Sequence, residues 1–333
     1  MGSGLRQSLR RGVKRAAITG GLEAAGLMAA AGLMGAARGR GIIFTLHHVR
    51  PKIARAFDPN GHLEVTPEFL DAAIRQLQAQ NYRLLPLDRV PAALADAAHP
   101  PFAVFTLDDG YRNNRDHALP VFARHGVPFT VFVAGGYVDR SHSMWWETGA
   151  ALIEKFDASP AEKYAAFARL GETILRAGEA RHVADLDRRA AEAGIDARAI
   201  AAELTLDADE LKSFAAHPLV TLGAHTISHR ALGLLDEAEA EQEMRASADR
   251  IEAIAGKRPT TIAYPYGDPL AATPRDFALA ARLGFSVGVT TRPGTLSAGQ
   301  LLTALPRVSL NGFYQKRRYV RALASGIPFR LTG

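Results

Sequence analysis

From Gly41 onward the chain alternates short apolar runs with longer stretches of helical periodicity. This alternation is typical of repeated βα units, which build a parallel sheet or a barrel. We therefore predict an α/β fold, namely a distorted (β/α) barrel of about seven parallel strands. The eight candidate strands are Gly41–Leu46, Tyr82–Leu85, Phe102–Leu107, Val127–Val133, Leu219–Ala224, Thr261–Tyr264, Phe285–Thr290 and Leu305–Leu310.

One long segment between two of these candidate strands lacks strand signals. From Trp146 to Pro218 the sequence is rich in Ala, Glu and Arg, which predicts a helical insertion at about residues 148–216 with solvated charged faces. No internal repeat and no low-complexity linker divides the chain. We therefore expect a single domain over residues 41–330, with the insertion forming a lid or a wall.

The first forty residues form a segment of different character. Basic residues precede an Ala- and Gly-rich stretch from Ala16 to Ala37, a pattern shared by export signals and membrane anchors. Glu23 and five glycines within that stretch disfavour a stable membrane span. An export signal, with a twin-arginine pair at Arg10-Arg11 and a small-residue site at 35–37, stays open. We favour a basic helix that packs on the body or lies on an anionic membrane surface, a peripheral contact. For localisation we therefore favour the cytoplasm or a membrane surface, and export by an N-terminal signal stays open.

Charge and cysteine content narrow the classes of function. Residues 1–40 hold seven Lys and Arg and one Glu, so the remaining chain carries 33 basic and 33 acidic side chains. The net charge of +6 thus comes from the N-terminal segment, and a neutral body argues against a nucleic-acid partner. The absence of cysteine excludes disulfides, thiolate nucleophiles and Cys-bound metals. Any metal must therefore be held by His and carboxylate side chains.

Polar residues follow three of the predicted strands. Asp108 and Asp109 follow the strand that ends at Leu107, and His225 and His229 follow the strand that ends at Ala224. A Pro-Tyr-Gly sequence at 265–267 follows a third strand. The carboxyl ends of parallel strands carry the site in barrels of this class, and one Asp with two His can form a three-ligand metal site with an open position. The alternatives are a structural or surface histidine pair and an ordinary Asx turn or helix cap.

Three segments together resemble the signatures of one family. Residues Phe105–Gly110 (FTLDDG) are similar to the first motif of the polysaccharide deacetylases (NodB homology, carbohydrate esterase family 4), in which T-F-D-D-G is usual. Residues His225–His229 (HTISH) resemble the second motif, H-[ST]-x-x-H, and Ala263–Gly267 (AYPYG) resemble the third. The order of the motifs and their positions at strand ends also agree, so the resemblance spans about Gly41 to Gly312.

The resemblance implies a fold, an activity and a set of site residues. Residues 41–330 would be the catalytic domain of a metal-dependent hydrolase that removes N-acetyl, or O-acetyl, groups from an acetylated oligosaccharide or polysaccharide. Asp109, His225 and His229 would hold a divalent metal, for which we expect Zn²⁺. Asp108 would be the general base, and the backbone N–H of Tyr266 would donate to the oxyanion.

The sequence departs from the family pattern at two places. Ala263 stands where the third motif usually begins with an Arg that orients the catalytic Asp, and no late Leu-x-His motif supplies the general acid. Residues 46–49 (LHHV) resemble the early Tyr-His-x-Val motif of the subgroup that includes poly-N-acetylglucosamine and chitooligosaccharide deacetylases. We therefore predict His47 as the general acid, with His48 as the alternative. Arg307 is the predicted replacement for the orienting Arg.

Several interpretations remain beside this one. Tyr111, Trp145 and Trp146 either line a sugar-binding groove or belong to the core. A deformylase or amidohydrolase acting on a lipid-linked amino sugar or a small amide would suit the basic, apolar N-terminus. A non-catalytic glycan-binding module would explain the missing Arg, although the retained Asp108 argues against it. The sequence contains neither a Gly-x-Ser-x-Gly elbow nor a dinucleotide-binding Gly-x-Gly-x-x-Gly after the first strand.

Overall fold

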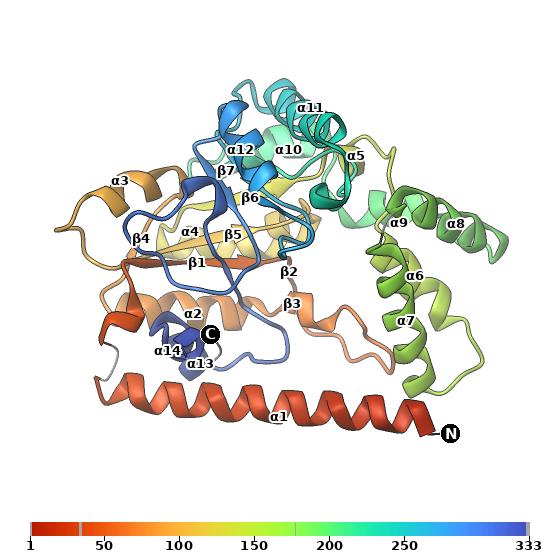
Figure 1. Cartoon of the computed structure of the whole chain (residues 1–333), viewed down its shortest axis with the longest axis horizontal. Helices are drawn as coiled ribbons and strands as arrows, with labels where there is room; N and C mark the ends of the chain where they lie inside the picture. The colour runs from red at the N-terminus through yellow and green to blue at the C-terminus, as the bar shows by residue number, and fades with distance from the viewer. Residues whose placement is uncertain (1, 33–34, 177, 331–333) are drawn as a thin grey trace.

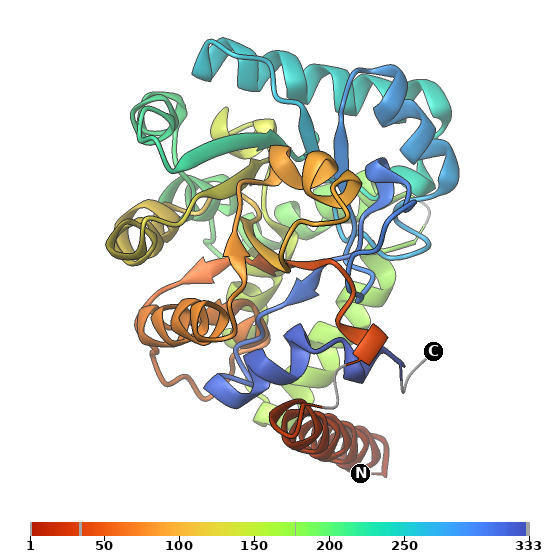
Figure 2. The same cartoon turned by 90° about the vertical axis from the view of Figure 1, so that its left-hand side faces the viewer.

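A curled sheet of parallel strands forms the centre of the molecule (Figures 1 and 2). The computed structural model describes residues 2–32, 35–176 and 178–330. The strand order is β10-β1-β5-β6-β7-β8-β9, and β4 pairs with β5 beside this path. A parallel bridge between Val289 and Leu305 draws the two ends of the path toward each other. The bounds are β1 Gly41–Leu46, β4 Arg83–Leu84, β5 Phe102–Leu107, β6 Phe129–Val133, β7 Val220–Ala224, β8 Thr261–Ala263, β9 Val287–Val289 and β10 Val308–Ser309.

The central strands are continuous apolar runs because both of their faces are buried. All six residues of β1 and all six of β5 are buried, and the two strands pair in register over their whole length. Side chains such as Ile43, Val104 and Val287 fill the interior of the barrel. Their neighbours on the opposite face, Phe44 and Phe105 among them, pack against the surrounding helices.

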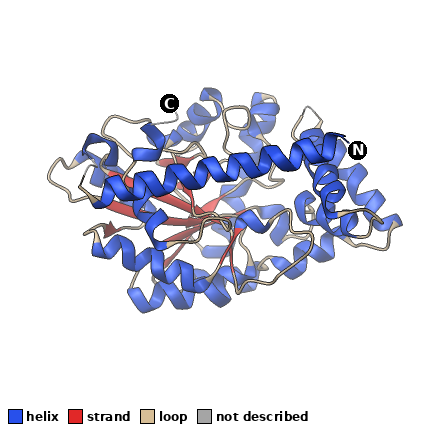
Figure 3. Ribbon diagram, turned by 90° about the horizontal axis from the view of Figure 1, so that it is seen from below, coloured by secondary structure: helices blue, strands red, loops and turns tan. Residues whose placement is uncertain are grey.

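Helices surround the sheet, as Figure 3 shows in blue around the red strands. Helix α2 begins at Pro67, because the Thr66 side chain accepts a hydrogen bond from the Phe69 N–H and Pro67 suits the first helical position. The helices outside the insertion are α1 Gly2–Ala30, α2 Pro67–Ala79, α3 Val90–Ala95, α4 Leu119–His125, α5 Gly135–Val138, α11 Glu237–Ala255, α12 Pro274–Arg282, α13 Arg317–Ala324 and α14 Ile327–Arg330. A short pair of parallel strands, β2 His48–Val49 and β3 Glu64–Val65, follows β1.

Besides the short α5, five further helices lie between β6 and β7 in the described part of the chain. They are α6 Trp145–Glu154, α7 Pro160–Ile174, α8 Glu179–Glu192, α9 Ala197–Leu204 and α10 Ala208–Ala215. Helices α6 to α9 stand together at one side of the barrel (Figure 1) and share a hydrophobic cluster with the start of the β6–α5 connection. Helix α10 instead packs its Leu211 and Phe214 into the main core. We call α6 to α9 the helical insertion from here on.

The N-terminal helix α1 packs along the outside of the body (Figures 1 and 3). Its residues Leu22, Ala25 and Ala29 are buried against a cluster formed by α13 and α14, and Glu23 accepts hydrogen bonds from Arg318 and Tyr319. No helix within the described ranges is both long and apolar enough to span a membrane. The side chains of Arg10-Arg11, on which the export hypothesis rests, lie outside the described set. Peripheral membrane contact stays a prediction.

Candidate metal-binding and catalytic site

The carboxyl ends of β5, β7 and β8 bring the three motifs together. The turns that follow these strands depend on left-handed backbone, which is uncommon for residues other than glycine. Asp109 has φ of 72° and is followed by Gly110 at 69°, so the chain reverses sharply after β5. His229 has φ of 57° and Tyr266 has φ of 59°. These backbone angles aim side chains from separate strands at one point.

Asp109, His225 and His229 form a buried cluster whose potential ligand atoms all lie within 4.8 Å of one another. The Nε2 atoms of His225 and His229 lie 3.5 and 3.4 Å from Asp109 Oδ1. These separations are longer than ordinary charge-assisted hydrogen bonds. They match the spacing between ligands of a tetrahedral ion with bonds of about 2.0–2.2 Å, which is roughly 3.3–3.5 Å.

Two further contacts support a cation in this cluster. The His225 Nδ1 lies 2.7 Å from the Ala263 carbonyl oxygen, which can only accept, so Nδ1 carries a proton and Nε2 is the nitrogen left to face Asp109. Asp109 Oδ1 is buried and has no hydrogen-bond partner among the described residues. A buried carboxylate in this position requires a compensating positive charge, which a bound cation would supply. The residues present therefore fit a divalent metal.

Asp108 lies beside this cluster and is held by Arg307. The Arg307 Nη1 and Nη2 atoms donate to the two carboxylate oxygens at 2.7 and 2.8 Å. Arg307 also donates from Nε to the Thr290 carbonyl and from Nη1 to Thr106 Oγ1, both at 3.0 Å. Burial raises the pKa of Asp108, but the charge and hydrogen bonds of Arg307, together with the charges of His225 and His47, outweigh it and leave the pKa below its ordinary value. Asp108 is therefore held ionised and in a fixed orientation.

The two adjacent histidines occupy different environments. His47 Nε2 lies 4.0 Å from Asp108 Oδ2, and its side chain is 22% exposed. Burial lowers the pKa of His47, and the charges of Asp109 and Asp108 oppose this effect without cancelling it. His47 can therefore face both the carboxylate and a bound molecule.

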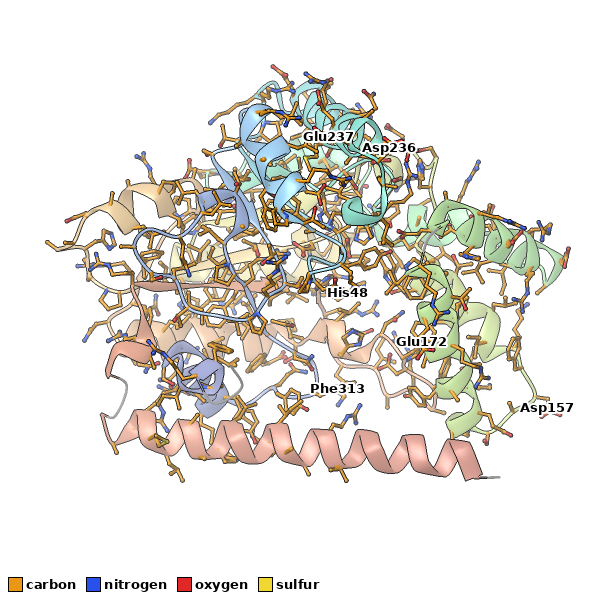
Figure 4. The ribbon with its side chains drawn as sticks, in the orientation of Figure 1. His48, Asp157, Glu172, Asp236, Glu237 and Phe313 are labelled. Atoms are coloured by element: carbon orange, nitrogen blue, oxygen red, sulfur yellow. The ribbon has the colours of Figure 1, made fainter. Side chains whose placement is uncertain are left out.

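His48 is enclosed, between the barrel and the helical insertion (Figure 4). Its ring packs on Tyr111 with 3.6 Å between ring centroids. Asn113 accepts a hydrogen bond from the Val49 N–H through Oδ1, so its Nδ2 donates to His48 Nδ1 at 2.8 Å. The remaining nitrogen, Nε2, lies 3.8 Å from Glu147. This geometry favours His47 over His48 for chemistry near Asp108.

The three aromatic residues singled out from the sequence are buried. Tyr111, Trp145 and Trp146 are 0%, 8% and 7% exposed. Trp146 donates to the Tyr111 hydroxyl at 3.1 Å and its ring lies 4.9 Å from that of His229. They pack around the candidate metal ligands as part of the core. Packing of these ligands is therefore a better-supported role for them than stacking on a sugar ring.

Sequence reasoning missed two carboxylates that touch the motif loops. Glu243 of α11 accepts hydrogen bonds from the Ile227 and Ser228 N–H groups, at 2.8 and 2.9 Å. Glu179, the first residue of α8, is 5% exposed and accepts from the Tyr266 hydroxyl and the Ala231 N–H. A single Glu in an Ala- and Arg-rich segment reads as a solvated helix face, so no sequence signal marked Glu179.

A cavity of about 390 Å³ borders the cluster at His229 and Tyr266. Its other wall is formed by α8 of the helical insertion and by residues 141–143, which precede the insertion. The cavity makes one metal-ligand candidate and one motif residue reachable from outside the barrel.

Comparison with known proteins identifies the family. Residues 95–288, more than half of the chain, match the family model for polysaccharide deacetylases. YxkH of Bacillus subtilis (strain 168), which carries the name of a polysaccharide deacetylase, is 22% identical over 251 residues. That match covers 75% of this chain and 66% of YxkH, slightly less than two thirds of its length.

Two solved structures share the architecture. IcaB from Ammonifex degensii superposes with a TM-score of 0.57 at 17% identity, covering 86% of this chain and 97% of the other. The Streptococcus pyogenes deacetylase PplD, solved with acetate, gives a TM-score of 0.53 at 18% identity, covering 81% and 92%. At these identities the likeness concerns the fold, and it confirms the predicted distorted barrel.

The matched segment includes both strand-end motifs that supply the buried cluster, the Asp108-Asp109 pair and the two histidines. The fold, the order of the motifs and the family match agree with one another. This chain belongs to the polysaccharide deacetylase family.

Proposed function

We propose that this enzyme removes N-acetyl groups from an acetylated glycan in a metal-dependent reaction, with Asp108 as the general base and His47 as the general acid. The observation that carries the proposal is the position of Asp108. An ionised carboxylate, held by two hydrogen bonds from Arg307, lies beside a buried cluster suited to a cation and 4.0 Å from an imidazole. A proton acceptor and a proton donor thus flank a site for the acetyl group.

Asp109, His225 and His229 are the residues that would hold the metal, and Zn²⁺ suits their donor set of one carboxylate and two imidazoles. A divalent ion bound there would polarise the acetyl carbonyl and lower the pKa of a water molecule. The ring of Tyr266 packs 5.0 Å from that of His229, so the Tyr266 backbone belongs to the same small region.

The protein groups then perform three tasks. Asp108 takes a proton from the attacking water as the new carbon–oxygen bond forms. The Tyr266 N–H, for which no backbone acceptor is present among the described residues, is free to donate to the oxyanion. His47 delivers a proton to the nitrogen as the carbon–nitrogen bond breaks, which yields acetate and a free amine. A lowered pKa makes the His47 imidazolium a stronger proton donor.

The alternative of a non-catalytic glycan-binding module loses its motivation. That interpretation was based on Ala263, which stands where an orienting Arg is usual. Arg307, which directly precedes β10, donates to the Asp108 carboxylate instead. Asp108 therefore has a guanidinium partner although the third motif lacks its Arg. No contact among the described residues favours a lipid-linked or formylated substrate over an acetylated glycan.

The test is acetate release from N-acetylglucosamine oligomers by wild-type protein and by Asp108→Asn, with bound metal quantified in both. We expect release by the wild type alone at equal metal content. Equal release by both proteins would overturn the role of Asp108. No release from any acetylated glycan by metal-loaded wild type would overturn the substrate class and redirect the search to lipid-linked amino sugars.

A further inference from the structure

We propose that Glu179, in the helical insertion, is a positioning residue of the deacetylase site. It joins the loop that carries the two histidines (residues 225–231, the histidine loop) to the loop that carries Tyr266 (residues 264–267, the tyrosine loop). This inference rests on the function proposed above for the meaning of the site, although its central measurement does not require turnover.

The two oxygens of Glu179 bind different loops. Oε1 accepts a hydrogen bond from the Tyr266 hydroxyl at 2.7 Å, and Oε2 accepts one from the Ala231 N–H at 3.0 Å. Ala231 follows the metal-ligand candidate His229 by two residues. The histidine loop leaves β7 and the tyrosine loop leaves β8, so one carboxylate connects the ends of two neighbouring strands.

The direction of the hydrogen bond to Tyr266 follows from its neighbours. The Trp145 indole N–H can only donate, and it donates to the Tyr266 hydroxyl oxygen at 2.9 Å. The single hydroxyl proton of Tyr266 is therefore directed at Glu179. Trp145 is the first residue of α6 and Glu179 the first of α8, two helices of the insertion labelled in Figure 1. Two helices of the insertion thus hold the Tyr266 phenol.

Because Glu179 is buried, the loss of these two hydrogen bonds would be energetically costly. Glu179 is 5% exposed, and a buried carboxylate must be compensated by donors such as these two. Burial raises the pKa of Glu179, and the bonds from the Ala231 N–H and the Tyr266 hydroxyl act in the opposite direction. Removing the side chain would leave a buried N–H and a partly buried hydroxyl without their acceptor.

The contacts of Glu179 indicate that it positions other residues of the site and takes no direct part in the reaction. Each of its oxygens already accepts a hydrogen bond from a protein donor, and Glu179 is not part of the buried group of candidate metal ligands. Its effect on the site runs through Tyr266, whose ring lies 5.0 Å from that of His229, and through the backbone beyond His229. This arrangement predicts an effect on how tightly and how correctly the metal ligands are held.

The experiment compares Co²⁺ binding by wild type, Glu179→Gln and Glu179→Ala, followed by the visible absorption of the bound ion. Loss of an outer-shell partner typically weakens metal binding about 10–100-fold. We expect the Co²⁺ Kd to rise about tenfold or more in Glu179→Ala. Glu179→Gln keeps one acceptor oxygen, so it should give a smaller increase. Asp185→Ala is the matched control, because Asp185 lies on the same helix, is 43% exposed and pairs only with Arg188.

A second measurement separates the effect on kcat from the effect on KM. At saturating metal, Glu179→Ala should lower kcat about tenfold while KM for the glycan changes less than threefold. Tyr266→Phe removes the phenol that Glu179 binds, so the loss of kcat in the double variant should be smaller than the product of the two single losses. Thermal unfolding of each variant shows whether the comparison is made on folded protein.

The outcomes separate the inference from the proposed function. A Co²⁺ Kd and a kcat of Glu179→Ala within twofold of wild type would overturn the inference, as would a lowered Tm with unchanged Co²⁺ binding and spectrum. If wild type releases no acetate but the Co²⁺ Kd rises as expected, the positioning role stands and the proposed substrate falls. If wild type releases acetate while Glu179→Ala binds Co²⁺ and turns over normally, the proposed function is supported and the positioning role of Glu179 is overturned.

Discussion

Arg307 donates two hydrogen bonds to the carboxylate of Asp108, and the two residues lie 199 positions apart in the sequence. Arg307 immediately precedes β10, whereas Asp108 immediately follows β5, and β1 lies between these strands in the sheet. Arg307 is 1% exposed and Asp108 is 3% exposed. Arg307 and Asp108 therefore form a buried, bidentate ion pair across the barrel, and the first prediction concerns its removal.

Arg307→Ala should lower the free energy of unfolding by about 3–5 kcal/mol, because it leaves the buried charge of Asp108 without its partner. It should also lower kcat, since Asp108 loses the charge that keeps its pKa low. Urea denaturation measures the first effect. The double variant Arg307→Ala, Asp108→Asn should recover part of the lost stability. A stability change below about 1 kcal/mol, the range typical of exposed pairs, would contradict a buried link.

Adjacent aspartates should behave in opposite ways. Asp109→Asn should lower metal content together with activity, because Asp109 Oδ1 faces both histidine Nε2 atoms. Asp108→Asn should retain the metal and lose about 10²–10⁴-fold in kcat, the usual contribution of a general base. Metal analysis of the purified proteins, combined with acetate release, distinguishes them. Equal metal loss in both variants would place Asp108 among the ligands instead.

His47 and His48 give a test based on the leaving group. An amine must be protonated to leave, whereas 4-nitrophenolate leaves without a proton. His47→Ala should therefore lose about 10²-fold on an N-acetylated glycan and far less on 4-nitrophenyl acetate. His48→Ala should lower thermal stability, because the imidazole is packed against Tyr111 and bonded to Asn113. If His47→Ala lost equal activity on the amide and on the ester, His47 would not be the acid.

The contact between α1 and α13 should weaken in acid. Hydrogen bonds from Arg318 and then Tyr319 lower the pKa of Glu23 from 4.5 to about 2. A lowered carboxyl pKa stabilises the docked state above the ordinary value of 4.5, and this stabilisation is lost as the pH falls toward 2. Hydrogen exchange in residues 22–29 should therefore show less protection, relative to the intrinsic rate, at pH 3 than at pH 6. Glu23→Gln should show the reduced protection at both pH values.

Much of the fold was accessible from the sequence because its strands are buried on both faces. Each of the eight predicted runs contains a strand, and β1 and β5 match their predicted bounds at Gly41–Leu46 and Phe102–Leu107. The later strands are shorter than their apolar runs. For example, the run at Phe285–Thr290 pairs only over Val287–Val289, because apolar side chains before and after a strand also enter the core.

The site divides into a predictable part and an unpredictable part. Strand-end position marked Asp108, Asp109, His225 and His229, since these polar residues interrupt apolar runs. Arg307 could be proposed because it is a basic residue within the strand-like run Leu305–Leu310. Glu179 carried no such mark, because its environment is created by the packing of α8 onto loops more than forty residues away. Tertiary contacts of an insertion cannot be read from local periodicity.

The left-handed backbone at Asp109, His229 and Tyr266 has a consequence for attempts to copy the site. A short synthetic peptide with the sequence of the histidine loop would populate right-handed and extended conformations instead, since a left-handed residue costs roughly 1–2 kcal/mol. Its two imidazoles would then point in unrelated directions. Transplanting this site into another scaffold therefore requires the strand ends and the carboxylates of Glu243 and Glu179 along with the motif residues.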